Sequence, residues 1–203
     1  MGRRPHVNRK SAMRVVDGQV RRKNNWVRDA GDYMVRYQDE IVLDRRDPGS
    51  GYRHVLTIAD VRAFLDLLPA WDDVAIGLDA IVLDHDPSAL GWHTIGVVAL
   101  CSWERDLWWR SCSPEFFAEH REVFDLFGVE HAKRGPRYEL RWTEEQVRAF
   151  QLVYVLAHEL GHHRDRVTTR NLGACPRGEP YAEAYARRSM REVWPVYARR
   201  FGL

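Results

Sequence analysis

The sequence predicts an α+β fold in which a small mixed or antiparallel sheet packs on a long helix near residues 144–165 and on a second helix that follows it. Three observations predict this arrangement. Short apolar runs separated by turn residues fill the first half of the chain, as expected for strands. Residues 144–165 carry apolar side chains at helical spacing. A second stripe of the same period begins near residue 180.

The first half of the chain alternates strand candidates with turns and one helix. Strands are predicted at 41–43, 80–83, 94–101 and 103–109. The turn residues at 47–51 end the first of them. Thr57 begins a helix because Asp60, three residues later, suits the reciprocal N-terminal cap, and Pro69 ends this helix.

The second half contains the longer helices. Pro114 begins a helix rich in phenylalanine, and Gly128 is its stop signal. A short strand at 138–142 leads to Thr143, which caps the long helix together with Gln146. The apolar stripe of that helix comprises Val147, Phe150, Val153, Tyr154, Ala157 and Leu160.

The long helix ends in the motif His158-Glu159-Leu160-Gly161-His162. Two histidines four residues apart lie on one helical face, so both imidazoles can bind one divalent metal ion, most often zinc. Zinc makes a water molecule nucleophilic near neutral pH, and Glu159 can take its proton as a general base. The ordinary alternative is an amphipathic helix with two surface histidines.

A catalytic zinc ion takes three protein ligands and keeps one open position. No histidine follows His163, so the third ligand is expected to be a carboxylate, and Glu179 and Glu183 compete for that role. Pro180 suits the first helical position, which places Glu179 at the cap. We favour Glu183, because it lies beside the buried stripe and a metal ion would offset the burial of its charge. The alternative for Glu183 is an ion pair with Arg187. The buried stripe comprises Ala182, Ala186, Met190, Val193 and Tyr197.

The motif followed by Glu183-Ala184-Tyr185-Ala186 resembles the gluzincin metallopeptidases, in which HExxH precedes a Glu-x-x-Ala or Glu-x-x-Asp helix. In size the chain is closest to minigluzincins and ImmA/IrrE-type bacterial peptidases, and the resemblance covers about residues 143–190. It implies a zincin-like fold, one Zn²⁺ per chain on His158, His162 and Glu183, and Glu159 as base. It also implies a protein or peptide substrate, aligned by an edge strand that we place within 94–109.

Several neighbouring residues are candidates for supporting roles. Asp165 shares the face of His162 and can orient a ligand imidazole; alternatively, it is a helix-end residue balanced by flanking arginines. Tyr181, Tyr185 and His93 are candidates for stabilising an oxyanion, although such side chains more commonly pack.

Two further residues near the motif are interpreted without a catalytic role. We interpret His163 as a surface residue. Cys175 lies between the two ligand-bearing helices, and we interpret it as a free loop cysteine rather than as a cap on the metal.

Composition predicts one domain at 26–203 preceded by a basic arm at 1–25. A hydrophobic content of 45% supports a substantial core, and no apolar run reaches the length of a membrane span. The N-terminal arginines precede no apolar segment, so no secretory signal is expected. Three cysteines without paired metal spacing favour the reducing cytoplasm.

The first 25 residues carry eight basic side chains against one acidic residue, Asp17. A solvated tail is the favoured interpretation, and nucleic acid or an acidic protein is the alternative partner. Two other functional classes therefore stay open beside a metallopeptidase. One is a catalytically silent or regulatory module that engages DNA or a protein partner. The other is a toxin or defence effector protease.

Overall fold

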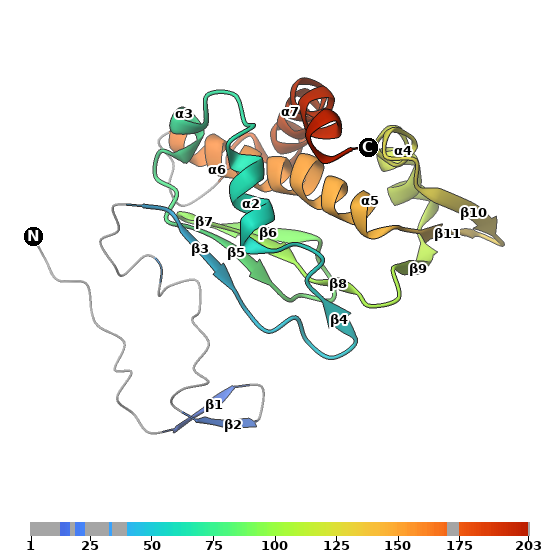
Figure 1. The fold of residues 1–203 in the computed structure, drawn as a ribbon, viewed down its shortest axis with the longest axis horizontal. Helices are drawn as coiled ribbons and strands as arrows, with labels where there is room; N and C mark the ends of the chain where they lie inside the picture. Colours follow the sequence, from blue (N-terminus) through green and yellow to red (C-terminus); the bar gives the residue numbers. More distant parts are fainter. Residues whose placement is uncertain (1–12, 17–18, 23–32, 34–39, 170–174, 203) are drawn as a thin grey trace, which may run out of the picture.

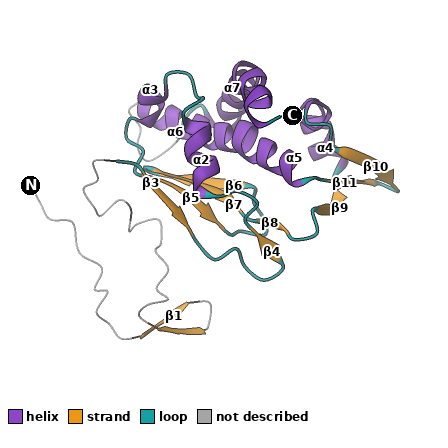
Figure 2. Ribbon diagram, viewed as in Figure 1, coloured by secondary structure: helices purple, strands orange, loops and turns teal. Residues whose placement is uncertain are grey.

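The computed structural model describes residues 13–16, 19–22, 33, 40–169 and 175–202. These residues form an α+β arrangement in which helices lie along one side of a mixed sheet (Figures 1 and 2). The predicted α+β class is therefore confirmed. In the described part of the chain, no helix has the length and apolar character that crossing a membrane requires.

The central sheet has the strand order β3-β5-β7-β6. Strands β3 (Val42–Arg45), β5 (Ala80–Asp84) and β7 (Val97–Cys101) are parallel, and β6 (Gly91–Thr94) is antiparallel to β7. Alternate residues of β5 and β7 pack on opposite faces, as the two-residue period of a strand requires. The face toward the helices contributes Ile81, Leu83, Val98 and Leu100 to the main core.

One strand prediction was wrong in a way that matters for the site. The predicted strand 94–101 is divided by a turn at Ile95 and Gly96, and Gly96 has a φ of 70° that favours glycine. The apolar run through this turn concealed it in the sequence. The edge strand next to the motif helix is consequently β6, residues 91–94, and β3 is the opposite edge. Most of the segment where we expected the edge belongs to the interior strand β7 or to strands outside this sheet.

The predicted helix starts at Thr57 and Pro114 are confirmed, but the first of these helices ends at Leu65, before Pro69, which we expected to end it. Helix α2 (Ile58–Leu65) begins at a reciprocal cap in which Thr57 and Asp60 bond each other's backbone N–H groups. A short helix that the sequence did not predict, α3 (Trp71–Ala75), follows it. Helix α4 (Pro114–Leu126) begins after Ser113 and stops before Gly128.

Three smaller antiparallel sheets complete the strands. Strands β10 (Glu130–Arg134), β11 (Arg137–Arg141) and β9 (Trp108–Cys112) form one sheet, and β4 (Tyr52–Arg53) pairs with β8 (Trp103–Glu104). The sequence missed β10 because all its residues are exposed, which leaves no alternation to detect. Within the basic arm, β1 (Met13–Val16) pairs with β2 (Gln19–Arg22), and the rest of the arm lies outside the described residues.

The motif helix is continuous but not uniform. It runs from α5 (Glu144–Ala149) through a π-helical turn, η2 (Phe150–Val155), into α6 (Leu156–Thr169). The reciprocal cap predicted at its start is present. Because a π turn changes the rotation per residue, it resets which face of α6 points to the sheet, and such turns are common at functional sites.

Helix α7 (Gly178–Phe201) packs closely on α6. A Cβ at Gly161 would lie only 2.8 Å from the Cα of Ala182, so the glycine and the small alanine let the two backbones approach. The predicted buried stripe of α7 is confirmed in full. The predicted cap at Glu179 was wrong, because Arg177 occupies the cap position and Glu179 lies in the first turn.

Candidate metal centre

The two motif histidines and Glu179 form a compact triangle of ligand atoms. The Nε2 atoms of His158 and His162 lie 3.2 Å apart. The carboxylate of Glu179 places Oε2 at 3.2 Å from Nε2 of His158 and Oε1 at 3.3 Å from Nε2 of His162. Ligands of a tetrahedral zinc ion at bond lengths of about 2.0–2.1 Å lie roughly 3.3 Å apart. The three residues therefore form a group that could hold a zinc ion, with a different carboxylate oxygen of Glu179 next to each histidine.

Glu183, which we expected to be the third ligand, lies on the other side of the His158 ring. Its Oε2 is 3.5 Å from Nδ1, not Nε2, of His158. The hydroxyl of Tyr154 donates to its carboxylate, and Nε of Arg187 donates to Oε1 at 2.6 Å. The ion pair with Arg187 that the sequence offered as an alternative is thus present. The structure brings Glu179, the competing candidate, to the two Nε2 atoms instead.

The surroundings of Glu183 keep it ionised. Burial by itself raises the pKa of this carboxyl group, but hydrogen bonds from His158 and Tyr154 and the charge of Arg187 outweigh burial and lower the pKa to about 2. Burial also lowers the pKa of His158, and its hydrogen bond to Glu183 reverses that effect, so the pKa of His158 is raised. A carboxylate on Nδ1 directs the Nε2 lone pair of an imidazole toward a metal.

His162 has a different environment. Its ring is buried, and burial together with the neighbouring His93 lowers its pKa, so that the neutral, ligand-competent form is favoured. Its Nδ1 atom is buried without a hydrogen-bond partner among the described residues. Asp165, for which orienting a ligand imidazole was one of two interpretations, does not satisfy this atom.

Asp165 instead connects the two helices of the site. Its fully buried carboxylate accepts hydrogen bonds from the backbone N–H groups of Arg177 and Gly178, at 2.8 and 3.1 Å, and from Nε of Arg177 at 2.8 Å. These contacts hold the first turn of α7, which carries Glu179, against α6. Asp165 therefore positions the helix that carries Glu179 rather than an imidazole ring.

Glu159 is buried between α6 and the edge strand β6. Its Oε2 accepts a hydrogen bond of 2.9 Å from Nδ1 of His93, whose ring stacks on His162 at 4.0 Å. A Cβ at Gly91 would lie 2.8 Å from Oε1 of Glu159, so the edge strand passes directly against the carboxylate. Of the three residues considered for stabilising an oxyanion, His93 is therefore the one with a hydrogen bond to the motif glutamate, whereas Tyr185 lies against Gly161 of the motif.

The two candidate tyrosines have other contacts. The ring of Tyr181 lies under the guanidinium of Arg177, 3.7 Å from the ring centroid, and Tyr185 packs on the main core. The surface interpretation of His163 was wrong: this residue is buried, and its Nε2 donates to the carbonyl of Ile76 at 2.9 Å.

A cavity of about 460 Å³ opens onto the triangle. Its lining includes Leu90, Phe116, His120 and Val155 together with His158, Glu159 and Glu179. Sequence reasoning missed Tyr154 and His120 as residues of the site. The signal for Tyr154 was available, because it precedes His158 by four residues and so lies near the same helical face. His120 comes from α4, and nothing in its local sequence relates it to the motif.

Comparison of the chain with protein-family models, with curated proteins and with solved structures finds no significant match.

Proposed function

We propose that this protein is a zinc-dependent metallopeptidase of the gluzincin type, in which His158, His162 and Glu179 hold one zinc ion. The observation that carries the proposal is the convergence of the two Nε2 atoms and the two oxygens of the Glu179 carboxylate, each oxygen within 3.3 Å of one histidine, next to the buried Glu159. The proposal assigns the third ligand to Glu179 rather than to Glu183. The side chain of Glu179 is 76% exposed, so it faces the open side of the centre.

Zinc bound there would polarise a peptide carbonyl and lower the pKa of an attacking water. Glu159 is the general base: it takes the proton of that water and later transfers it to the leaving amine nitrogen. The hydrogen bond from Nδ1 of His93 to Oε2 fixes the carboxylate rotamer and leaves Oε1 to face the edge strand at Gly91.

The described residues also provide a place for an extended substrate. Strand β6 is the edge of the central sheet that contacts α6. An extended peptide that pairs with such an edge passes over the motif, and an apolar side chain of that peptide fits the cavity lined by Leu90, Phe116 and Val155. The substrate class is thus a protein or peptide in extended form.

The decisive experiment compares the wild type with Glu159→Gln. We expect both to retain about one zinc per chain by elemental mass spectrometry, whereas cleavage of a degenerate peptide library falls by about 10²–10⁴-fold in the variant, as for loss of a general base. Glu145→Gln, which changes an exposed residue at the start of α5, is the matched control and keeps full activity. Undiminished cleavage by Glu159→Gln contradicts the proposed mechanism.

The basic arm lies largely outside the described residues. Nucleic-acid binding and the effector role therefore stay predictions of the sequence.

A further inference from the structure

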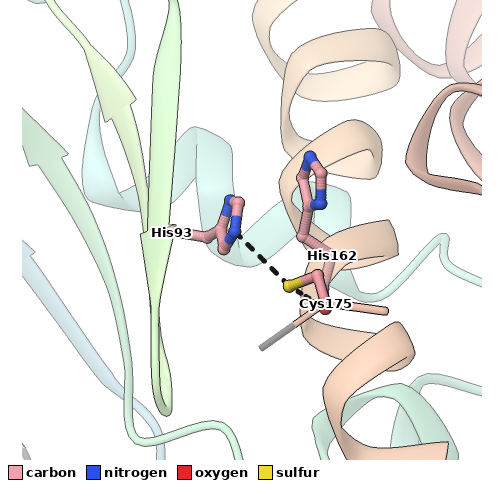
Figure 3. A group of neighbouring side chains, drawn as sticks. All are labelled: His93, His162 and Cys175. Atoms are coloured by element: carbon pink, nitrogen blue, oxygen red, sulfur yellow. Dashed lines mark hydrogen bonds between the residues drawn. The ribbon is translucent and has the colours of Figure 1, made fainter. Parts of the chain in front are cut away.

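The two ends of edge strand β6 differ in what lies beside them. At the His93 end the side chains pack closely: the ring of His93 stacks on His162 at 4.0 Å, and its Nε2 lies 3.6 Å from Sγ of the free cysteine Cys175 (Figure 3). At the Gly91 end two cavities adjoin each other. A peptide aligned along β6 therefore finds room for its side chains at the Gly91 end.

The second of these cavities has a volume of about 150 Å³ and shares Ser88 and Leu90 with the cavity that opens onto the triangle. It is lined by the segment 86–90, which leads into β6, and by residues of the paired strands β4 and β8. Sites for whole small molecules have volumes of about 300–1,000 Å³, so a cavity of this size accommodates a single side chain.

The two adjoining cavities are lined by acidic residues. Among the described residues that line either cavity, none is lysine or arginine, whereas six are carboxylates: Asp86, Glu104, Glu119, Glu159, Glu179 and Glu183. Arg187 pairs with Glu183, and a zinc ion would offset the charges at the triangle, but the carboxylates of the second cavity are not part of that group. Clefts lined by one sign of charge attract ligands of the opposite sign.

Glu104 is the residue of the second cavity with an unmet interaction. Its Oε2 is buried and has no hydrogen-bond partner among the described residues. Two nearby arginines are engaged elsewhere, because Arg105 donates to the carbonyl of Tyr52 and Arg110 pairs with Asp106. Burial raises the pKa of Glu104, and the charge of Asp106 adds to this effect. A buried carboxylate oxygen without a partner costs free energy, and a cationic side chain in the cavity would remove that cost.

The remaining walls of the cavity suit the apolar part of a basic side chain. Pro87, Leu90 and Trp109 line it together with Glu104. Lysine and arginine carry a charged end on an apolar stem, and the stem packs favourably on such surfaces. An indole ring also attracts a cation that lies near its face. The cavity thus combines an apolar wall with one unpartnered carboxylate oxygen.

We propose that this cavity is a specificity pocket in which Glu104 binds the basic side chain of a substrate residue near the scissile bond. The substrate class is then a protein or peptide with an arginine or lysine at a fixed position relative to the cut. The inference rests on the proposed function, because it names the substrate of that same site. Glu104 does not touch the reacting atoms; it determines which peptides bind.

The test is the sequence preference with which the zinc-supplied full-length chain cleaves a degenerate peptide library, measured by mass spectrometry of the products. We expect arginine and lysine to be enriched at least about tenfold at one position, the effect that a hydrogen bond to a charged group supplies. Glu104→Gln loses this enrichment, and Glu104→Arg replaces it by enrichment of aspartate and glutamate. Glu115→Gln, which changes an exposed residue of α4 outside both cavities, keeps the preference of the wild type.

A matched pair of substrates separates charge from shape. Citrulline has nearly the shape of arginine but no charge. In the wild type, replacement of the preferred arginine by citrulline should lower kcat/KM at least about tenfold, whereas Glu104→Gln should cleave the two peptides at similar rates. A preference for arginine over citrulline that Glu104→Gln retains would assign the recognition to another residue.

The outcomes distinguish the specificity pocket from the proposed function. If the wild type cleaves the library without enriching a basic residue, or if Glu104→Gln keeps the enrichment, the pocket is overturned and the metallopeptidase stands. If the wild type cleaves no peptide, the proposed function fails, and fluorescence anisotropy with labelled libraries that contain a fixed arginine or citrulline tests the pocket by binding alone. Tighter binding of the arginine library that Glu104→Gln abolishes sustains the pocket, and equal binding of both libraries overturns it.

Discussion

The hydroxyl of Tyr154 lies 2.7 and 2.8 Å from the two carboxylate oxygens of Glu183. This contact holds Glu183 on the Nδ1 side of His158, where in the proposed centre it would orient the ring and leave Nε2 for the metal. Glu179, one helical turn earlier, is the carboxylate that reaches both Nε2 atoms. The two glutamates thus have different partners because they lie one turn apart on α7. Glu179 lies next to the two Nε2 atoms, and Glu183 lies next to Nδ1 of His158.

Because Glu179 and Glu183 contact different atoms of the histidines, we expect their replacement to have unequal effects on zinc binding. Glu179→Gln removes a charged ligand and abolishes stoichiometric zinc binding, whereas Glu183→Gln removes an orienting partner and weakens zinc binding about 10–100-fold. Competition with a chelator of known affinity measures both. Stoichiometric zinc in Glu179→Gln together with its loss in Glu183→Gln would return the ligand role to Glu183.

Gly91 is predicted to be required for activity rather than for metal binding. The Cβ of Gly91→Ala would lie 2.8 Å from Oε1 of Glu159 and 2.8 Å from the carbonyl oxygen of Ala99, so strand and carboxylate must separate. We expect peptide cleavage to fall by at least about tenfold, because general-base catalysis is sensitive to position. Zinc content should stay near that of the wild type, and a loss of zinc equal to the loss of activity would contradict this assignment.

Gly161 is predicted to be a stability determinant inside the motif. In Gly161→Ala the new Cβ meets the Cα of Ala182 at 2.8 Å, and helix backbones cannot yield as a flexible side chain does. Overpacking of this kind costs about 1–3 kcal/mol in the free energy of unfolding, which denaturant titration of the metal-free protein measures. Glu192→Ala, an exposed position of α7, is the control and should lie within about 0.5 kcal/mol of the wild type.

Asp165 is predicted to make stability depend on acidic pH. Burial raises the pKa of its carboxyl group, but the hydrogen bonds from Arg177 and Gly178 outweigh burial, so the pKa in the folded protein is lowered. Because its pKa is lower in the folded than in the unfolded protein, ionised Asp165 stabilises the fold fully when the pH is above the unfolded-state pKa. This stabilisation is lost as the pH falls through the folded-state pKa.

The variant Asp165→Asn tests this contribution. It should be less stable than the wild type near neutral pH, and the difference should shrink as the pH falls below the ordinary range of aspartate. Thermal unfolding of both metal-free proteins across that range measures it. A difference that is constant with pH would show that the charge of Asp165 is not what connects α6 to α7.

Local signals in the sequence predicted much of the fold. The reciprocal caps at Thr57 and Thr143 are properties of four consecutive residues, and both are present. The buried stripe of α7 follows from its 3.6-residue period. By contrast, the turn at Gly96 was hidden inside an apolar run, and β10 was missed because its side chains are all exposed.

The same division holds for the site. His158 and His162 lie on the same face of one helix, and Glu159 is next to His158, because of their spacing in the sequence. The sequence by itself therefore determined the part of the candidate site that α6 contributes. Only the tertiary structure decided that Glu179 completes the triangle and that His93, 66 residues from Glu159, holds the base. These contacts depend on the crossing of α7 over α6 and on the pairing of β6 with β7. Packing of distant segments sets such geometry to within an ångström, and no local pattern of residues encodes it.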